Sequence, residues 1–205
     1  MDAMYAGTGA ALLSLDRTWI GQWMLSRPVI LGTALGWVLG DLPVGWWIGL
    51  LFEALSLDAE PVGGVIPLNG TIATAATLLI ALGGTRVPLA AAFPAGLAFG
   101  LLYRPVEEKI RRRRDAWTGQ FASVLREGGS APWGKAFTVS FLEEFAIAAL
   151  VLTAGVAASS ILLQFLWGWA PTIIRTGFED ALSATPLIAA GALISCLLRK
   201  DRLGK

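Results

Sequence analysis

The sequence contains no histidine, which removes the commonest metal ligand and the commonest acid–base group at neutral pH. Its one cysteine, Cys196, lies in an apolar run, which excludes a disulfide within the chain and zinc sites of the CxxC type. Nucleophile elbows, P-loops and dinucleotide fingerprints are also missing from the sequence. We therefore expect no metal site, no cofactor, no phosphohistidine and no enzymatic activity of the chain on its own.

Charged residues are scarce at 15%, against about 25% in soluble domains. Apolar residues make up 55% of the 205 residues, and the mean hydropathy is +0.64. A soluble chain of this size has too much surface for its volume to hide so much apolar area. The composition therefore predicts an all-α, multi-pass integral membrane protein embedded in a lipid bilayer. The net charge of +1 gives no reason to expect nucleic acid as a partner.

The second half of the chain has long uncharged stretches. Residues 145–174 and 181–198 carry no acidic or basic side chain, and a transmembrane helix needs about 20 apolar residues. We expect these stretches to form the two arms of a transmembrane hairpin. Its joint is expected near residues 167–171, which hold two tryptophans and a proline.

The first hundred residues have short apolar segments instead. Residues 28–40 stop before an Asp-Leu-Pro sequence, and residues 60–70 hold two prolines, three glycines and an asparagine. Lipid cannot hydrogen-bond free backbone groups, so broken helices survive in membranes only within protein or beside a wet cavity. Transporters build substrate sites from such breaks. We expect a transporter core with a re-entrant loop over about residues 58–70; two ordinary loops between short helices are the alternative.

Glycines recur at four-residue spacing in this first half, which places them on one face of a helix. Such faces let helix backbones approach closely in a membrane. We expect close packing at these positions, either within the chain or against a partner. The glycines are Gly32, Gly36 and Gly40, then Gly45 and Gly49, then Gly96 and Gly100.

Basic residues gather between residues 104 and 126 and in the last seven residues. The positive-inside rule places both groups on the cytoplasmic side. The chain then divides into a transporter core (1–103), a basic cytoplasmic segment (104–134), a transmembrane hairpin (135–198) and a basic cytoplasmic tail (199–205). Five arginines form a candidate docking surface for cytoplasmic proteins: Arg104, Arg111, Arg112, Arg113 and Arg114.

Carboxylates within apolar segments need a reason, because a charge in a span costs about 2.5–3.5 kcal/mol on insertion scales. Glu53 has apolar neighbours on both sides, Asp58 follows at the entrance to the broken segment, and Asn69 lies within it. Their oxygens and amide can bond the hydroxyl groups of a polar substrate. The alternative for Glu53 is a structural role at broken-helix N–H groups. Asp16 is expected to pair with Arg17 or to lie at the membrane interface.

Several motifs occur in an order that resembles one known family. They are LLSLDR at 12–17, GQWMLSRP at 21–28, LGD at 39–41, GLLFEALSLD at 49–58 and PVGGVIP at 61–67. Together they resemble the IIC subunits of the mannose–fructose–sorbose family of bacterial phosphotransferase systems, with the likeness strongest over residues 10–81. Leu68 and Asn69 stand where the family has a second loop proline followed by an acid or amide.

This resemblance implies a permease subunit of the bacterial inner membrane that moves a hexose or amino sugar. Expected partners are a IID membrane subunit, in trimers of IIC–IID units, and the phosphocarriers IIA and IIB. The implied sugar-binding residues are Glu53, Asp58, Asn69 and Gln22, beside a structural loop with Pro61, Gly63, Gly64, Pro67 and Gly70. The alternative is a non-transporting scaffold that docks the phosphocarriers through its arginines.

Overall fold

The computed structural model describes residues 2–19, 21–56, 68–85, 87–130 and 132–203. This part of the chain is helical and contains no strand, which confirms the predicted all-α class. The elements are α1 (Asp2–Ser14), the 3-10 turn η1 (Leu15–Arg17), α2 (Pro28–Leu39), α3 (Leu42–Ser56), α4 (Gly70–Leu82), α5 (Leu89–Leu102), α6 (Arg104–Arg126), α7 (Trp133–Leu150), the π-helical segment η2 (Val151–Gly155), α8 (Val156–Trp169) and α9 (Thr172–Leu203).

The short helices α2, α3 and α5 pack around α4. Every residue of α4 from Gly70 to Ile80 is buried, and α4 also contacts α1 and α8. A helix without a polar face is stable only when neighbours or lipid surround it. Phe52 of α3 stacks on Phe93 of α5, with ring centroids 4.9 Å apart. The core of the molecule therefore lies around α4.

Glycines set the closest helix contacts. A Cβ on Gly32 would lie 2.5 Å from the carbonyl oxygen of Gly45, and a Cβ on Gly96 would lie 1.8 Å from Thr77 Oγ1. The close packing predicted from glycine spacing therefore occurs within the chain, between α2 and α3 and between α4 and α5. Gly40 has another role, because its φ of 89° ends α2 in the left-handed region.

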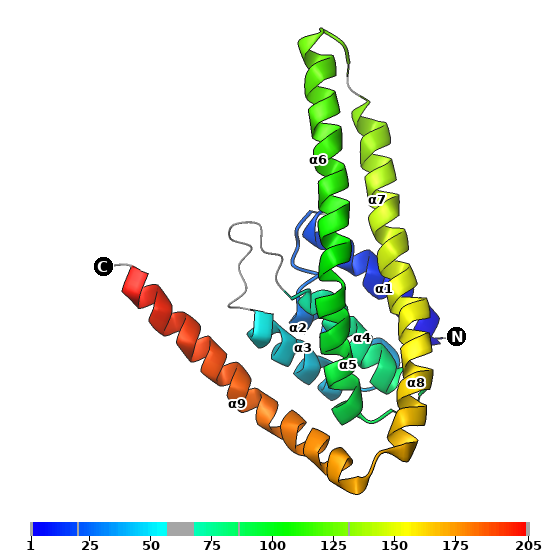
Figure 1. The fold of residues 1–205 in the computed structure, drawn as a ribbon, viewed down its shortest axis with the longest axis vertical. Coiled ribbons are helices and arrows are strands. Elements are labelled where there is room, and N and C mark those ends of the chain that lie inside the picture. Colours follow the sequence, from blue (N-terminus) through cyan, green and yellow to red (C-terminus); the bar gives the residue numbers. More distant parts are fainter. Residues whose placement is uncertain (1, 20, 57–67, 86, 131, 204–205) are drawn as a thin grey trace.

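Within the described residues, two helical stretches are long and apolar enough to cross a membrane, Leu89–Arg126 and Trp133–Trp169. The first has 38 residues and measures about 57 Å at 1.5 Å per residue, against about 30 Å for the hydrocarbon core of a bilayer. Its charged half, α6, lies beside α7. Together they form a long arm that extends away from the short helices (Figure 1). We call this element the α6–α7 arm.

The joint between α8 and α9 falls at residues 170–171, where the sequence predicted it. The two helices then diverge, so that they form an open V with the short helices between them (Figure 1). Instead of packing along α8, α9 contacts α3 and α5. Arg175 fixes the corner, since its Nε donates to Ala170 O at 2.9 Å and its Nη2 to Gly168 O at 3.1 Å. These bonds satisfy carbonyls at the end of α8 that have no intrahelical partner.

Candidate functional site

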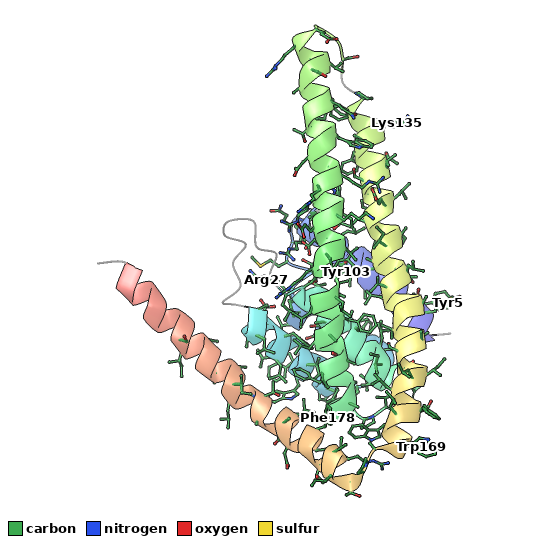
Figure 2. All side chains as sticks on the ribbon, viewed as in Figure 1. Tyr5, Arg27, Tyr103, Lys135, Trp169 and Phe178 are labelled. Carbon is green, nitrogen blue, oxygen red and sulfur yellow. The ribbon has the colours of Figure 1, made fainter. Side chains whose placement is uncertain are left out.

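Glu53 lies in the last turn of α3. Its Oε1 accepts a hydrogen bond from Arg27 Nη1 at 2.7 Å, and only 15% of its side chain is exposed. Figure 2 shows Arg27 beside this end of α3. The other carboxylate oxygen, Oε2, is buried and accepts no hydrogen bond from the described residues. Burying an unbonded polar atom costs free energy, so this oxygen is an available acceptor.

Asn69 caps the amino-terminal end of α4. Its Oδ1 accepts a hydrogen bond from the Ile72 N–H at 3.1 Å, and its Nδ2 donates to Glu107 Oε2 at 3.3 Å. In the first turn of α4, Thr71 Oγ1 donates to the carbonyl oxygen of Ser26 at 2.6 Å. The start of α4 is thereby tied both to α6 and to the segment that precedes α2.

Gln22 lies in that segment, residues 21–27, which we call the 21–27 loop. Its side chain is exposed and its φ is 54°, a left-handed conformation that is uncommon outside glycine. The carboxylate of Asp16 in η1 holds the loop: Oδ1 accepts the Trp23 N–H at 3.0 Å and Oδ2 accepts the Leu25 N–H at 2.8 Å.

The 21–27 loop brings three predicted residues into one region. It carries Gln22, it binds Glu53 through Arg27, and it binds the first turn of α4, next to Asn69. Gly70 is required in this turn, because a Cβ there would lie 2.9 Å from Pro28 Cγ. The other predicted positions lie outside the described residues: Asp58, Pro61, Gly63, Gly64 and Pro67.

A polar cavity of about 20 Å³ lies beside Asn69. It has room for about one water molecule, whereas sites for small-molecule ligands measure about 300–1,000 Å³. In this conformation the cavity is therefore too small for a ligand of that size. Two carboxylates line the cavity, those of Glu107 and Glu144. A metal site needs more ligands, and the described part of the chain holds no group of three potential metal ligands. The lining residues are Ser14, Arg17, Thr18, Asn69, Thr71, Ile72, Tyr103, Glu107 and Glu144.

Most of these lining residues were not among the predicted site residues. Glu107 stands 38 residues from Asn69 in the chain, and nothing in the local sequence pattern connects them. Glu144 accepts a hydrogen bond from Trp19 Nε1 at 2.6 Å. The only sequence signal for these two glutamates was that each is an acid close to an apolar segment.

Four of the five candidate docking arginines pair with glutamates of the same chain. Arg104 differs, since no ion pair joins it to a glutamate among the described residues. Its Nε is buried there without a hydrogen-bond partner, as is the Nε of Arg114. The charges of the other four are neutralised along α6 and across to α7. The pairs are Arg111 with Glu107 at 2.6 Å, Arg112 with Glu108 at 2.5 Å, Arg113 with Glu143, and Arg114 with Glu144.

The profile of the family described as "PTS system sorbose-specific iic component" matches residues 1–204. The chain is 27% identical to the N-acetylgalactosamine permease IIC component 1 of Escherichia coli (strain K12) over 182 residues, which cover 88% of this chain and 67% of that protein. It is 32% identical to the N-acetylgalactosamine permease IIC component 2 of the same strain over 108 residues, 48% of this chain and 80% of that protein.

Two solved structures share the fold. One is described as the structure of a membrane protein; its TM-score is 0.64 at 17% identity, covering 96% of this chain and 76% of that chain. The other is the mannose transporter ManYZ in complex with microcin E492, with a TM-score of 0.53 at 16% identity, covering 99% and 81%. At these sequence identities the structural likeness establishes the fold alone, and the match to the family profile establishes that the chain is a member of the family. The chain therefore belongs to the sorbose-specific IIC family and is a sugar-translocating membrane subunit of a phosphotransferase system.

Proposed function

We propose that this subunit moves a hexose or amino sugar across the bacterial inner membrane and that a IIB partner phosphorylates the sugar as it arrives. Both related permeases are named for N-acetylgalactosamine, which makes that sugar the first candidate. The observation that carries the proposal is the buried Oε2 of Glu53, which accepts no hydrogen bond from the described residues of this IIC-family chain. Sugar hydroxyls are donors, and a desolvated carboxylate oxygen is a strong acceptor for them.

The proposed sugar-binding residues are Glu53, Asp58, Asn69 and Gln22. Arg27 holds one oxygen of Glu53, which fixes the carboxylate while leaving the other oxygen for a hydroxyl group. The amide of Asn69 already bonds Ile72 and Glu107. An amide NH₂ has two donors and its oxygen two lone pairs, so Asn69 retains capacity for a sugar as well.

Transport then proceeds by rigid-body movement of α2–α5 against the V of α8 and α9. Glycine contacts make α2–α5 a densely packed unit. Its border with the V is hollow, since an apolar cavity of about 330 Å³ lies between α5, α8 and α9. Packed interiors resist deformation, so relative movement is easiest at the hollow border. The closed polar cavity beside Asn69 represents one state of this cycle.

The assembly proposed for this activity contains a IID membrane subunit, in trimers of IIC–IID units, with IIA and IIB on the cytoplasmic side. The α6–α7 arm and the chain's final basic residues are the parts proposed to face the cytoplasm. The arginines on α6 already form ion pairs with glutamates of this chain. A docking partner must therefore either displace these glutamates or bind the arginines in addition to them.

Sugar phosphorylation by membranes that contain this chain and its candidate IID partner tests the proposal. Phosphoenolpyruvate and the soluble phosphocarriers are supplied with N-acetylgalactosamine, other amino sugars and hexoses. We expect product with at least one sugar, and none when this chain is omitted. An assembled complex that phosphorylates no sugar would contradict the proposal and favour the non-transporting scaffold.

A further inference from the structure

We propose that Asp16 is a positioning residue of the sugar site, acting through the 21–27 loop. This inference rests on the proposed function. Asp16 is 1% exposed, and its two oxygens accept the N–H groups of Trp23 and Leu25. Among the described residues it forms no ion pair with a basic side chain. A buried carboxylate without a cation is costly. We therefore infer that the loop needs the hydrogen bonds of Asp16 to keep its conformation.

The loop needs these bonds because its backbone is strained. Gly21, Gln22 and Met24 have φ values of 64°, 54° and 67°. Glycine adopts this region freely, whereas in other L-residues the Cβ then lies too close to a backbone carbonyl oxygen. Two non-glycine residues within three positions are therefore held against their preference. Strain of this kind persists only where surrounding bonds over-determine the conformation, and the two bonds to Asp16 flank the strained Met24.

The strained conformation has consequences at both ends of the loop. It exposes Gln22, and it sets the position of Arg27, whose guanidinium holds Glu53. The Ser26 carbonyl, which accepts from Thr71, lies one residue beyond Leu25. If the loop relaxed, the Arg27 guanidinium and the Gln22 amide would both move. Asp16 thus governs the geometry of two groups proposed to bind or orient the sugar, without touching the sugar itself.

A carboxylate is suited to this task because both of its oxygens accept. An asparagine in its place has one acceptor oxygen and would point an NH₂ donor at the second backbone N–H. Asp16→Asn therefore loses a charge-assisted hydrogen bond and leaves the volume nearly unchanged. Asp115→Asn makes the same exchange at an exposed position on α6 and is the matched control.

The experiment measures the KM for sugar and the KM for phosphorylated IIB in membranes with equal amounts of assembled complex. For Asp16→Asn we expect the sugar KM to rise roughly tenfold or more, with the KM for IIB unchanged and both values unchanged in Asp115→Asn. Adding Met24→Gly to Asp16→Asn should lower the sugar KM again, most of the way to the wild-type value, because glycine adopts the left-handed backbone without the help of Asp16. Met24 is not among the proposed sugar-binding residues.

An unchanged sugar KM in Asp16→Asn overturns the inference, and so does a rise that Met24→Gly fails to reduce. If Asp16→Asn does not assemble, Thr71→Val replaces it by removing the bond to Ser26 at the other end of the loop; a raised sugar KM supports the inference and an unchanged one overturns it. A wild-type complex that phosphorylates no sugar is a different failure, because it overturns the proposed function itself.

Discussion

At the residue scale, Glu53 and Asn69 of the proposed site make structural hydrogen bonds and keep capacity for more. Glu53 shows this most clearly, since one oxygen is held by Arg27 and the other is buried and free within the described structure. A carboxylate placed in an apolar segment is stable only with such support. The support also orients the free oxygen, which is what a binding site requires.

Glu53→Gln is the substitution that tests this residue. It retains the shape of the side chain but removes the charge, so hydrogen bonds to both Arg27 and a sugar hydroxyl weaken. Hydrogen bonds to charged groups are worth about 1.5–3 kcal/mol, so we expect the sugar KM to rise about tenfold or more. Glu108→Gln is the control, because Glu108 is half exposed on α6, where it pairs with Arg112. Unchanged uptake and affinity in Glu53→Gln would remove Glu53 from the site.

The sequence singled out Glu53 because a lone acid among apolar neighbours is conspicuous, and its role in sugar binding stays a prediction. Of the two expectations for Asp16, pairing with Arg17 is wrong, because the carboxylate bonds the backbone of Trp23 and Leu25; a position at the membrane interface stays a prediction. The difference arises because left-handed backbone at Gln22 and Met24 leaves no mark in a hydropathy pattern. Such bonds depend on loop conformation, and only the structure reveals it.

At the element scale, glycine decides how closely the short helices approach. In the α2–α3 pair, a Cβ on Gly45 would lie 2.4 Å from Gly32 O and 2.5 Å from Gly36 Cα. Both neighbours are backbone atoms, which cannot rotate away as a side chain can. The spacing of these glycines predicted a packing face, but the partner helix could not be read from spacing alone. The tight loop around Asp41, whose Oδ1 accepts the Val44 N–H at 3.1 Å, makes the next helix that partner.

We expect Gly45→Ala to force α2 and α3 apart and to destabilise the protein by about 1–3 kcal/mol, the usual range for overpacking. The apparent melting temperature of the detergent-solubilised protein measures this change. Gly119→Ala is the matched control, because nothing lies within 4 Å of a Cβ at that α6 position and alanine favours helix over glycine by about 1 kcal/mol. Equal effects of the two substitutions would show that close approach is not what Gly45 provides.

At the scale of the whole molecule, the open V of α8 and α9 is the feature that hydropathy could not predict. Apolar length establishes that a helix can span a bilayer, but packing against neighbours determines its tilt. The joint was predictable, since Pro171 interrupts the apolar stretch and two tryptophans before it are typical of a membrane–water interface. The angle was not, because it depends on contacts of α9 with α3 and α5, which are distant in sequence. In Figure 2, Trp169 and Phe178 mark the two sides of this corner.

Arg175 is the one side chain that bonds the carbonyls at the corner within the described structure. Arg175→Met keeps a long side chain but removes every donor, which leaves Gly168 O and Ala170 O unbonded at the end of α8. Carbonyls at a helix end that lose their donors must find other partners, so the corner should relax toward other conformations. We expect a wider spread of angles between α8 and α9, with little change in the packing of α2–α5.

Spin-label distances between α8 and α9 measure that spread. Labels at Leu162 and Leu187 are suitable, because these side chains are 56% and 77% exposed, in a background with Cys196→Ala so that no other thiol reacts. Arg175→Met should broaden the distance distribution, while Arg126→Met, an exposed exchange at the far end of α6, should leave it unchanged. Transport should also slow in Arg175→Met, since α2–α5 would then move against a compliant V. If the distance distribution stays as narrow as in the wild type, the contacts of α9 with α3 and α5 fix the angle between α8 and α9, and Arg175 does not.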